Sequence, residues 1–160
     1  MPFTPFAFLL AFCTSAVRAH FRLQFPDPRG AFVAQKEIDF CGGYTDAVNN
    51  RTAFPLSGGM ISISSGHENF VVGVLLSTSQ NANTWEAFNN AGGQQQLVRN
   101  YARQPSAGTF CIPLDLNSTG IAGVQEGTNV TIQIVYLGGD GNLYQVRPLS
   151  QTVADSLFWL

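Results

Sequence analysis

Short stretches in which hydrophobic and polar residues alternate recur along the chain, as is typical of half-buried β-strands. They lie at His20–Phe25, Gly59–Ser64, Phe70–Leu76, Thr109–Ile112 and Val130–Tyr136. The stretch at 70–76 is denser in hydrophobic residues, which predicts a strand covered on both faces. Gly, Pro and Asn punctuate the chain between these stretches. The pattern predicts an all-β fold, a two-sheet antiparallel β-sandwich.

Three details of this pattern make local predictions. The odd-numbered residues of His20–Phe25 are all hydrophobic and are expected on one side of their strand. Pro113 is expected to end the strand that precedes it. Residues 80–107 are rich in Asn and Gln, which predicts a long surface excursion with one helical turn near Trp85–Phe88.

The first nineteen residues have the pattern of a signal peptide rather than of a domain. Phe6–Phe12 is an apolar run too short to span a bilayer. Val17-Arg18-Ala19 places small residues at the positions that signal peptidase requires. Cleavage there removes Cys13 and leaves His20 as the first residue of a secreted chain.

Three glycosylation sequons agree with secretion, since each has the form Asn-x-Ser/Thr without an intervening proline. Their asparagines are Asn50, Asn117 and Asn129. In the last predicted strand Asn129 shares one side with Thr131 and Gln133, so this side is expected to face water.

Composition and charge narrow the class of protein. The chain has 160 residues, of which 8 are Lys or Arg and 10 are Asp or Glu, so its net charge is −2. This length fits one domain. The charge is too low to hold a phosphate backbone, so nucleic-acid binding is not expected.

The two histidines of the chain suggest a metal site. His20 would carry a free α-amino group after cleavage, so that its amine and its imidazole Nδ1 could chelate one ion. His67, in a loop after an alternating stretch, could supply a third nitrogen and complete a histidine brace. Amine and imidazole donors suit copper(II), and an α-amine titrates near pH ~8, so it loses its proton readily. The alternative is that both histidines are solvated and without function.

An ordered series of motifs resembles the fungal copper acquisition factors, a family of lytic polysaccharide monooxygenase-like copper proteins. The resemblance runs from His20 to about Gln145. It is carried by His-Phe-x-Leu-x-Phe-Pro from 20, Phe-Cys-Gly-Gly from 40, Asn-Arg-Thr-x-Phe-Pro-Leu-Ser-Gly-Gly from 50, Gly-His at 66, Gly-Thr-Phe-Cys from 108 and Asp-Gly-Asn-Leu-Tyr-Gln from 140.

The resemblance implies an immunoglobulin-like sandwich with one copper ion in a histidine brace completed by an aspartate. His20 and His67 would supply the nitrogens, and Asp140 the carboxylate, with Asp115 as the fallback. Asp140 also lies in a Gly-Gly-Asp-Gly-Asn sequence that predicts a hairpin turn.

The resemblance further implies copper uptake or handling at the fungal cell surface, often through a glycosylphosphatidylinositol anchor. We expect a monomer that binds one copper(II) ion and exchanges it with a copper transporter or contacts cell-wall glycan. A carboxylate ligand would occupy a position that dioxygen chemistry needs open, so an enzyme is not expected. The rival hypotheses are a copper-dependent oxidase of glycans and a cell-wall structural protein without metal.

The C-terminal residues depart from the family, which usually continues after the Leu-Tyr segment with a cysteine and a closing strand. Residues 146–160 lack that cysteine and the apolar stretch of an anchor signal. We hypothesise that they translate an unspliced intron, and we place the domain at 20–145. An oxidising compartment allows a disulfide between Cys41 and Cys111, but the sequence leaves open whether they pair or one stays unpaired.

Overall fold

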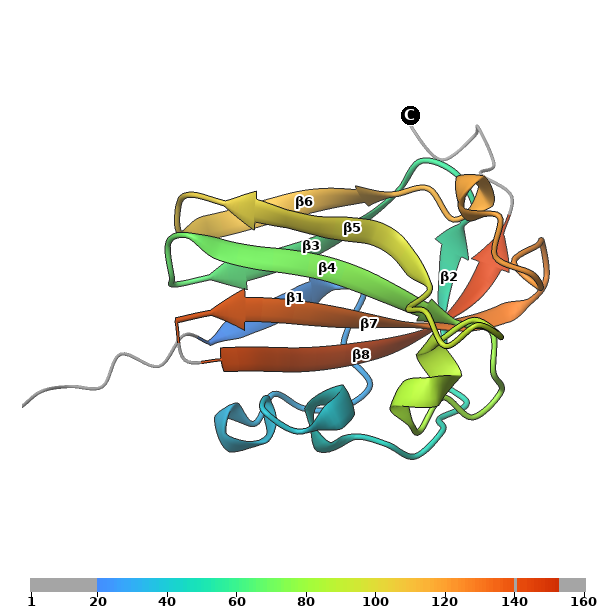
Figure 1. Cartoon of the computed structure of the whole chain (residues 1–160), viewed down its shortest axis with the longest axis horizontal. Helices are drawn as coiled ribbons and strands as arrows, with labels where there is room; N and C mark the ends of the chain where they lie inside the picture. The colour runs from blue at the N-terminus through green and yellow to red at the C-terminus, as the bar shows by residue number, and fades with distance from the viewer. Residues whose placement is uncertain (1–19, 140, 153–160) are drawn as a thin grey trace, which may run out of the picture.

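Two β-sheets pack face to face in the computed structural model, which describes residues 20–139 and 141–152 (Figure 1). The smaller sheet has the order β1 (Phe21–Phe25), β3 (Gly59–Ser65) and β6 (Gly108–Leu114). The larger has the order β2 (Thr52–Pro55), β8 (Gly141–Thr152), β7 (Asn129–Gly138), β4 (Phe70–Ser77) and β5 (Leu97–Gln104). Neighbouring strands are antiparallel except β2 and β8, which are parallel. The predicted all-β sandwich is confirmed.

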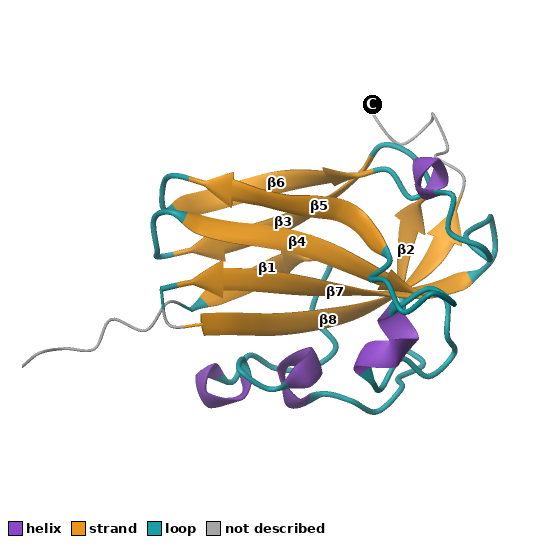
Figure 2. Ribbon diagram, viewed as in Figure 1, coloured by secondary structure: helices purple, strands orange, loops and turns teal. Residues whose placement is uncertain are grey.

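Helical structure in the described residues consists of short 3₁₀ turns (Figure 2). They are η1 (Ala34–Lys36), η2 (Phe40–Gly43), η3 (Trp85–Phe88) and η4 (Asn117–Thr119). The helical turn predicted at residues 85–88 is therefore confirmed.

Aromatic rings fill the core at the end where β1 begins. The Tyr136 ring stacks on Phe21 and Phe70, with ring centroids 4.9 and 4.8 Å apart, and all three side chains are fully buried. Burial of such large side chains stabilises the fold by about 1.5–3 kcal/mol each. This packing fixes the start of β1 between the sheets.

The expected strands form, with three differences. Phe25 is 50% exposed although Phe21 and Leu23 are buried, because the register of β1 shifts between Leu23 and Phe25. Pro113 does not end its strand but pairs with Met60 inside β6, which an edge strand tolerates because its outer side needs no N–H donor. The expected surface excursion contains β5, an edge strand with most side chains in water.

The outer face of β7 is covered by protein, so the prediction that Thr131 and Gln133 face water is wrong. Both side chains are buried. The Cys41 backbone N–H donates to Gln133 Oε1 over 3.1 Å, because the η2 segment packs across this face. Asn129, at the start of the strand, is exposed as expected.

The segment between β1 and β2 closes the free edge of β8. Arg29 N–H donates to Val146 O over 2.8 Å, and Tyr144 N–H donates to Glu37 O over 2.7 Å. Further along, β2 pairs with β8 from Leu149 onward. The Glu37 backbone is thereby fixed at the edge where β8 lies near β1.

The disulfide considered between Cys41 and Cys111 is absent, and both thiols are free. Cys41 is a buried residue of η2, on the outer face of the larger sheet, whereas Cys111 is exposed on β6 of the smaller sheet. Both sheets separate the two residues, so this pairing is wrong for the fold.

The strand β8 runs to Thr152, seven residues past the domain boundary expected at Gln145. Leu149 is buried in the core between the sheets, and Val146 is buried on the outer face of the larger sheet. The hypothesis that these codons come from an intron concerns the transcript and stays a prediction. Within the described residues, no helix has the length and apolarity that a membrane crossing requires.

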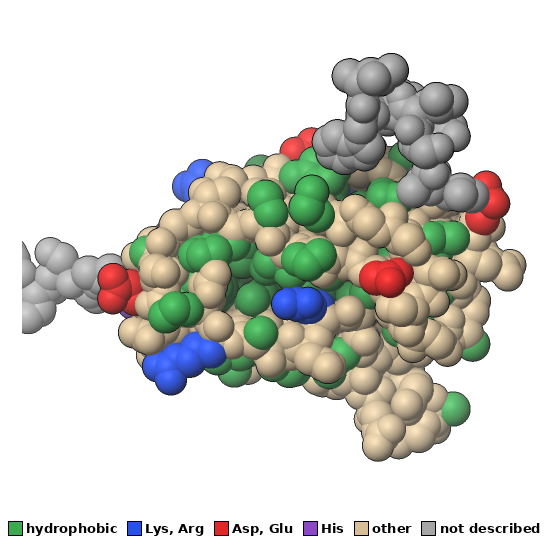
Figure 3. Space-filling view, turned by 90° about the horizontal axis from the view of Figure 1, so that it is seen from above, with side chains coloured by type: hydrophobic (Ala, Val, Ile, Leu, Met, Phe, Trp, Pro, Cys, Tyr) green, Lys and Arg blue, Asp and Glu red, His purple; other side chains and the backbone are tan. Residues whose placement is uncertain are grey.

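The strands β5 and β6 form the edge of the sandwich opposite β1 and β8 (Figure 1). Viewed from above, apolar side chains gather there with a few cationic side chains beside them (Figure 3). A groove of about 210 Å³ lies at this edge, lined by apolar side chains of both sheets and by Arg99 and Arg103.

Candidate metal centre

Three chain segments meet at one end of the sandwich: the start of β1, the end of β3 and the β7–β8 hairpin (Figure 1). Phe21 pairs with Ser65 across the two strands. This register brings His20, the residue before Phe21, to the same end as His67, two residues after Ser65. The two histidines predicted to act together are thus at one end of the molecule.

A serine fixes the backbone of His67. His67 N–H donates to Ser65 Oγ over 3.0 Å, and Ser65 Oγ is 3.1 Å from His67 O and 2.7 Å from Tyr136 Oη. Tyr136 stacks on Phe21, so the loop that carries His67 is tied to the start of β1 through buried groups. The imidazole Nε2 of His67 is buried and has no hydrogen-bond partner among the described residues.

The His20 imidazole lies partly in the sandwich edge, with 32% of its side chain exposed. Its ring meets Phe32 edge to face, with centroids 5.9 Å apart. Its Nδ1 is 2.6 Å from Glu37 Oε2. Nδ1 is also the atom that a brace would direct at the metal, so Glu37 lies where the metal chemistry was predicted.

Glu37 is almost fully buried, with 2% of its side chain exposed. Gln145 Nε2 donates to Glu37 Oε1 over 2.9 Å and to Phe21 O over 2.8 Å, while Gln145 Oε1 accepts from Leu23 N–H. Burial raises the pKa of the Glu37 carboxyl, and the hydrogen bonds from Gln145 and His20 partly oppose this rise in the pKa. The carboxylate, the glutamine and β1 therefore form one hydrogen-bonded unit.

Sequence reasoning missed Glu37. It lies outside regular secondary structure between Lys36 and Ile38, where an isolated acidic residue indicates an exposed loop. Glu37 lies beside His20 only because residues 26–50 run along the edge of β8, and no local sequence pattern predicts this contact.

The two aspartate candidates fare differently. Asp140 lies outside the described residues, but its neighbour Gly139 is beside His67: a Cβ at position 139 would lie 4.0 Å from His67 Cε1. Asp115 follows Leu114, which pairs with Gly59 at the far end of β3. Six residues of strand, about 20 Å, separate Gly59 from Ser65, so the fold does not bring Asp115 to the histidines.

No three side chains of His, Cys, Asp or Glu are close enough to hold a metal ion within residues 20–139 and 141–152. Asp140 lies outside these residues, and the α-amine of His20 would exist only after cleavage before it. His20, Glu37 and His67 therefore do not form one closed cluster as they stand.

A comparison with protein families matches nearly the whole described domain. The sequence profile described as "Copper acquisition factor BIM1-like" matches residues 18–146. The chain belongs to this family. His20, Glu37, His67 and Asp140 all lie within the matched residues.

Two curated relatives carry the name "Copper acquisition factor BIM1". One, from Cryptococcus neoformans var. neoformans serotype D, is 39% identical over 145 residues, which cover 90% of this chain and 65% of the relative. The other, from C. neoformans var. grubii serotype A, is 39% identical over 137 residues, which cover 85% and 62%. An uncharacterized protein of Aspergillus fumigatus is 34% identical over 149 residues, covering 90% and 57%. The chain thus spans less than two thirds of the length of these relatives.

Proposed function

We propose that this copper acquisition factor-like chain binds copper(II) at the His20 end of the sandwich after removal of residues 1–19. The His20 α-amine and imidazole Nδ1 and the His67 imidazole Nε2 supply the three nitrogens of a histidine brace. The protein carries the bound copper as cargo, which it takes up or passes on at the fungal cell surface.

One observation carries this proposal: the buried His67 Nε2 without a hydrogen-bond partner among the described residues. A buried nitrogen without a hydrogen-bond partner costs about 1–3 kcal/mol of folding free energy. This cost is recovered when the nitrogen binds a metal ion. The β1–β3 register, Phe21 opposite Ser65, supports the same assignment because it directs His20 and His67 to one end. The names of the family and of the two C. neoformans relatives support copper as the ion.

The donor set fits copper(II) by its chemistry. Imidazole and amine nitrogens bind copper(II) near the top of the divalent affinity order. The α-amine must lose a proton to bind, and its pKa near ~8 keeps this cost small at neutral pH. A carboxylate beside these nitrogens would add a hard, anionic donor that favours copper(II) over copper(I).

The same chemistry argues for binding rather than catalysis. An oxygen ligand would fill a position that dioxygen activation needs open. We therefore expect no sustained, copper-dependent release of oxidised oligosaccharides when the loaded protein is incubated with a reductant and cell-wall polysaccharides. Such release would show that the chain is an oxidative enzyme.

Secretion is part of the proposal because the α-amine exists only after cleavage. The sequon residues Asn50, Asn117 and Asn129 are all exposed, which is compatible with glycosylation in a secretory pathway. Mass spectrometry of protein from the culture medium of a fungal host should find His20 as the first residue.

The decisive experiment compares copper(II) binding by two forms of the chain. One begins at His20, and the other carries a single additional residue before it. The extension converts the amine into an amide and removes one ligand, so we expect affinity, measured by competition with a chelator, to fall at least about 10-fold. A His67→Ala variant of the form that begins at His20 should show a comparable loss. Equal affinity of the native and extended forms would refute the brace.

A further inference from the structure

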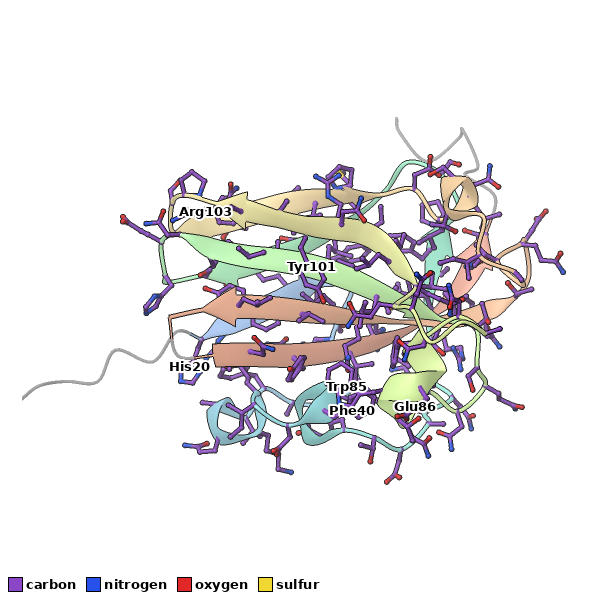
Figure 4. All side chains as sticks on the ribbon, in the orientation of Figure 1. His20, Phe40, Trp85, Glu86, Tyr101 and Arg103 are labelled. Atoms are coloured by element: carbon purple, nitrogen blue, oxygen red, sulfur yellow. The ribbon has the colours of Figure 1, made fainter. Side chains whose placement is uncertain are left out.

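A polar depression lies beside the edge strand β5 and reaches η3 on one side and η4 on the other. Its larger part has a volume of about 780 Å³. Asn100 and Thr119 line both of its parts. Glu86 from η3 lines one part, and Tyr101 from β5 lines the other (Figure 4). The larger part begins where β4 ends, whereas the proposed copper site lies where β4 begins, so the two sites are distinct.

The lining of the depression suits a neutral ligand that is rich in hydroxyl groups. Amide and hydroxyl side chains dominate it, and Glu86 and Arg99 are its charged residues. Amides both donate and accept hydrogen bonds, as a sugar hydroxyl also does. The Tyr101 ring packs against Gly73 of β4, where a Cβ would lie only 2.6 Å from the ring. This leaves 39% of Tyr101 exposed, as an apolar surface on which a sugar ring can pack.

One of the three sequons lies at the wall of this depression. Ser118 and Thr119, the second and third residues of that sequon, belong to the lining. Asn117 itself is exposed, and its side chain makes no hydrogen bond among the described residues. An oligosaccharide attached to Asn117 would therefore start beside the depression. Covalent attachment gives the sugars a high effective concentration there, so that contacts too weak to hold a free oligosaccharide are sufficient.

The strand β5 has unsatisfied backbone groups that such an oligosaccharide could meet. It pairs with β4 on one side and is the last strand of its sheet. The register of this pair shifts between Val72 and Val74 and again between Val74 and Leu75, which interrupts the ladder of hydrogen bonds. An edge strand exposes a row of N–H and C=O groups, and natural proteins commonly cover such an edge. Sugar hydroxyls can bond to both kinds of group.

We propose that the N-linked oligosaccharide of Asn117 lies in this depression and covers the free edge of β5. Its first sugars pack along the wall formed by Thr119, Asn100 and Tyr101 and restrain the opening of the strand. The inference rests on the secretion that is part of the proposed function, since N-glycosylation takes place in the secretory pathway. It does not depend on the binding of copper.

The experiment uses the chain secreted by a fungal host and its variant Asn117→Gln, which removes the acceptor amide of the sequon and keeps a side chain of similar kind. Asn50→Gln is the matched control, because it also removes one sequon and Asn50 precedes β2, at the opposite edge of the same sheet. Mass spectrometry determines which sequons carry sugar. Amide hydrogen exchange, followed by mass spectrometry of the peptide that covers residues 97–102, reports the opening of β5.

We expect sugar at Asn117 in the parent and exchange at residues 97–102 about 10-fold faster in Asn117→Gln, the effect of losing two hydrogen bonds. Peptides from β7 should exchange equally in both proteins, and Asn50→Gln should match the parent throughout. Asn100→Ala changes the wall and leaves the sequon intact, so it should reproduce part of the acceleration. Asn83→Ala is its control, because Asn83 is exposed and lies outside the lining.

Three other outcomes would overturn the inference. If Asn117 carries no sugar while Asn50 or Asn129 does, secretion stands and the proposed role of Asn117 is wrong. If Asn117 carries sugar but its removal leaves exchange at residues 97–102 unchanged, the oligosaccharide extends into water and does not cover β5. If the protein carries no sugar and keeps residues 1–19, the secretion in the proposed function fails, and this inference fails with it.

Discussion

A cysteine placed at position 146 should form a disulfide with Cys41. Val146 pairs with Gln133 across β7 and β8, and the Gln133 side chain accepts from the Cys41 backbone N–H. Paired residues of antiparallel strands project on the same face. Cys41 and Val146 also line one small cavity. The family resemblance expects a cysteine in this region, just after the Leu143-Tyr144 segment.

The expected gain in stability follows from the length of the closed loop. A link between positions 41 and 146 closes a loop of roughly 100 residues, for which the loss of unfolded-state entropy is about 4.7 kcal/mol. This gain is reduced by the loss of the buried Val146 side chain and by any strain that the disulfide causes in the native state. We expect about 2–4 kcal/mol net, which raises the midpoint of thermal unfolding by roughly 6–15 °C for a domain of this size.

The assay is made on the chain beginning at His20, which has two cysteines, Cys41 and Cys111. After oxidation with glutathione disulfide, Val146→Cys should titrate one free thiol, and peptide mapping should join positions 41 and 146. Val146→Ser is the control for the lost valine, and addition of a reductant should abolish the gain. Three titratable thiols, or a link to Cys111, would show that the placement of η2 over β8 is wrong.

Two further predictions use the same material. Cys41 is buried, and its burial raises the pKa of its thiol to about 12. Iodoacetamide at pH 8 should therefore modify the exposed Cys111 and reach Cys41 only after unfolding. Equal labelling of both cysteines would contradict the packing of η2. Burial also raises the pKa of Tyr136 above its ordinary value near 10. The folded state therefore holds the phenol proton more tightly than the unfolded state, and the free energy of unfolding should fall as the pH rises above ~10. In urea titrations Tyr136→Phe should lose less stability at alkaline pH than the parent, and an identical loss would refute this assignment.

Strands with a hydrophobic face were predictable from sequence because burial dictates their alternation. In β3, every second residue from Gly59 to Ser65 is buried. The strand β5 was missed for the opposite reason: it is an edge strand whose side chains are mostly in water, so hydrophobic periodicity carries no signal there. The outer face of β7 was misread because Thr131 and Gln133 are polar, and only tertiary packing of η2 buries them.

The residues of the candidate site also differ in how far they could be predicted from the sequence. His20 and His67 could be named from sequence because the predicted cleavage and the rarity of histidine single them out. Their shared location depends on pairing between strands some 40 residues apart, which the register of β1 and β3 supplies. Glu37 needed still more, since it reaches His20 only because the 26–50 segment bonds to the edge of β8 at Tyr144 and Val146.

The buried Gln145 would make the chain end proposed at His20 a rigid ligand. The first residue of a domain is ordinarily poorly ordered, and a disordered amine and imidazole would lose much entropy on binding an ion. Here Gln145 bonds the backbone of β1 at Phe21 and Leu23, while the Phe21 ring is fully buried against Tyr136. Folding thus orders the residue next to His20 before any ion binds. The same glutamine orients Glu37, so one side chain on β8 aligns the chain end and the carboxylate that meets its imidazole.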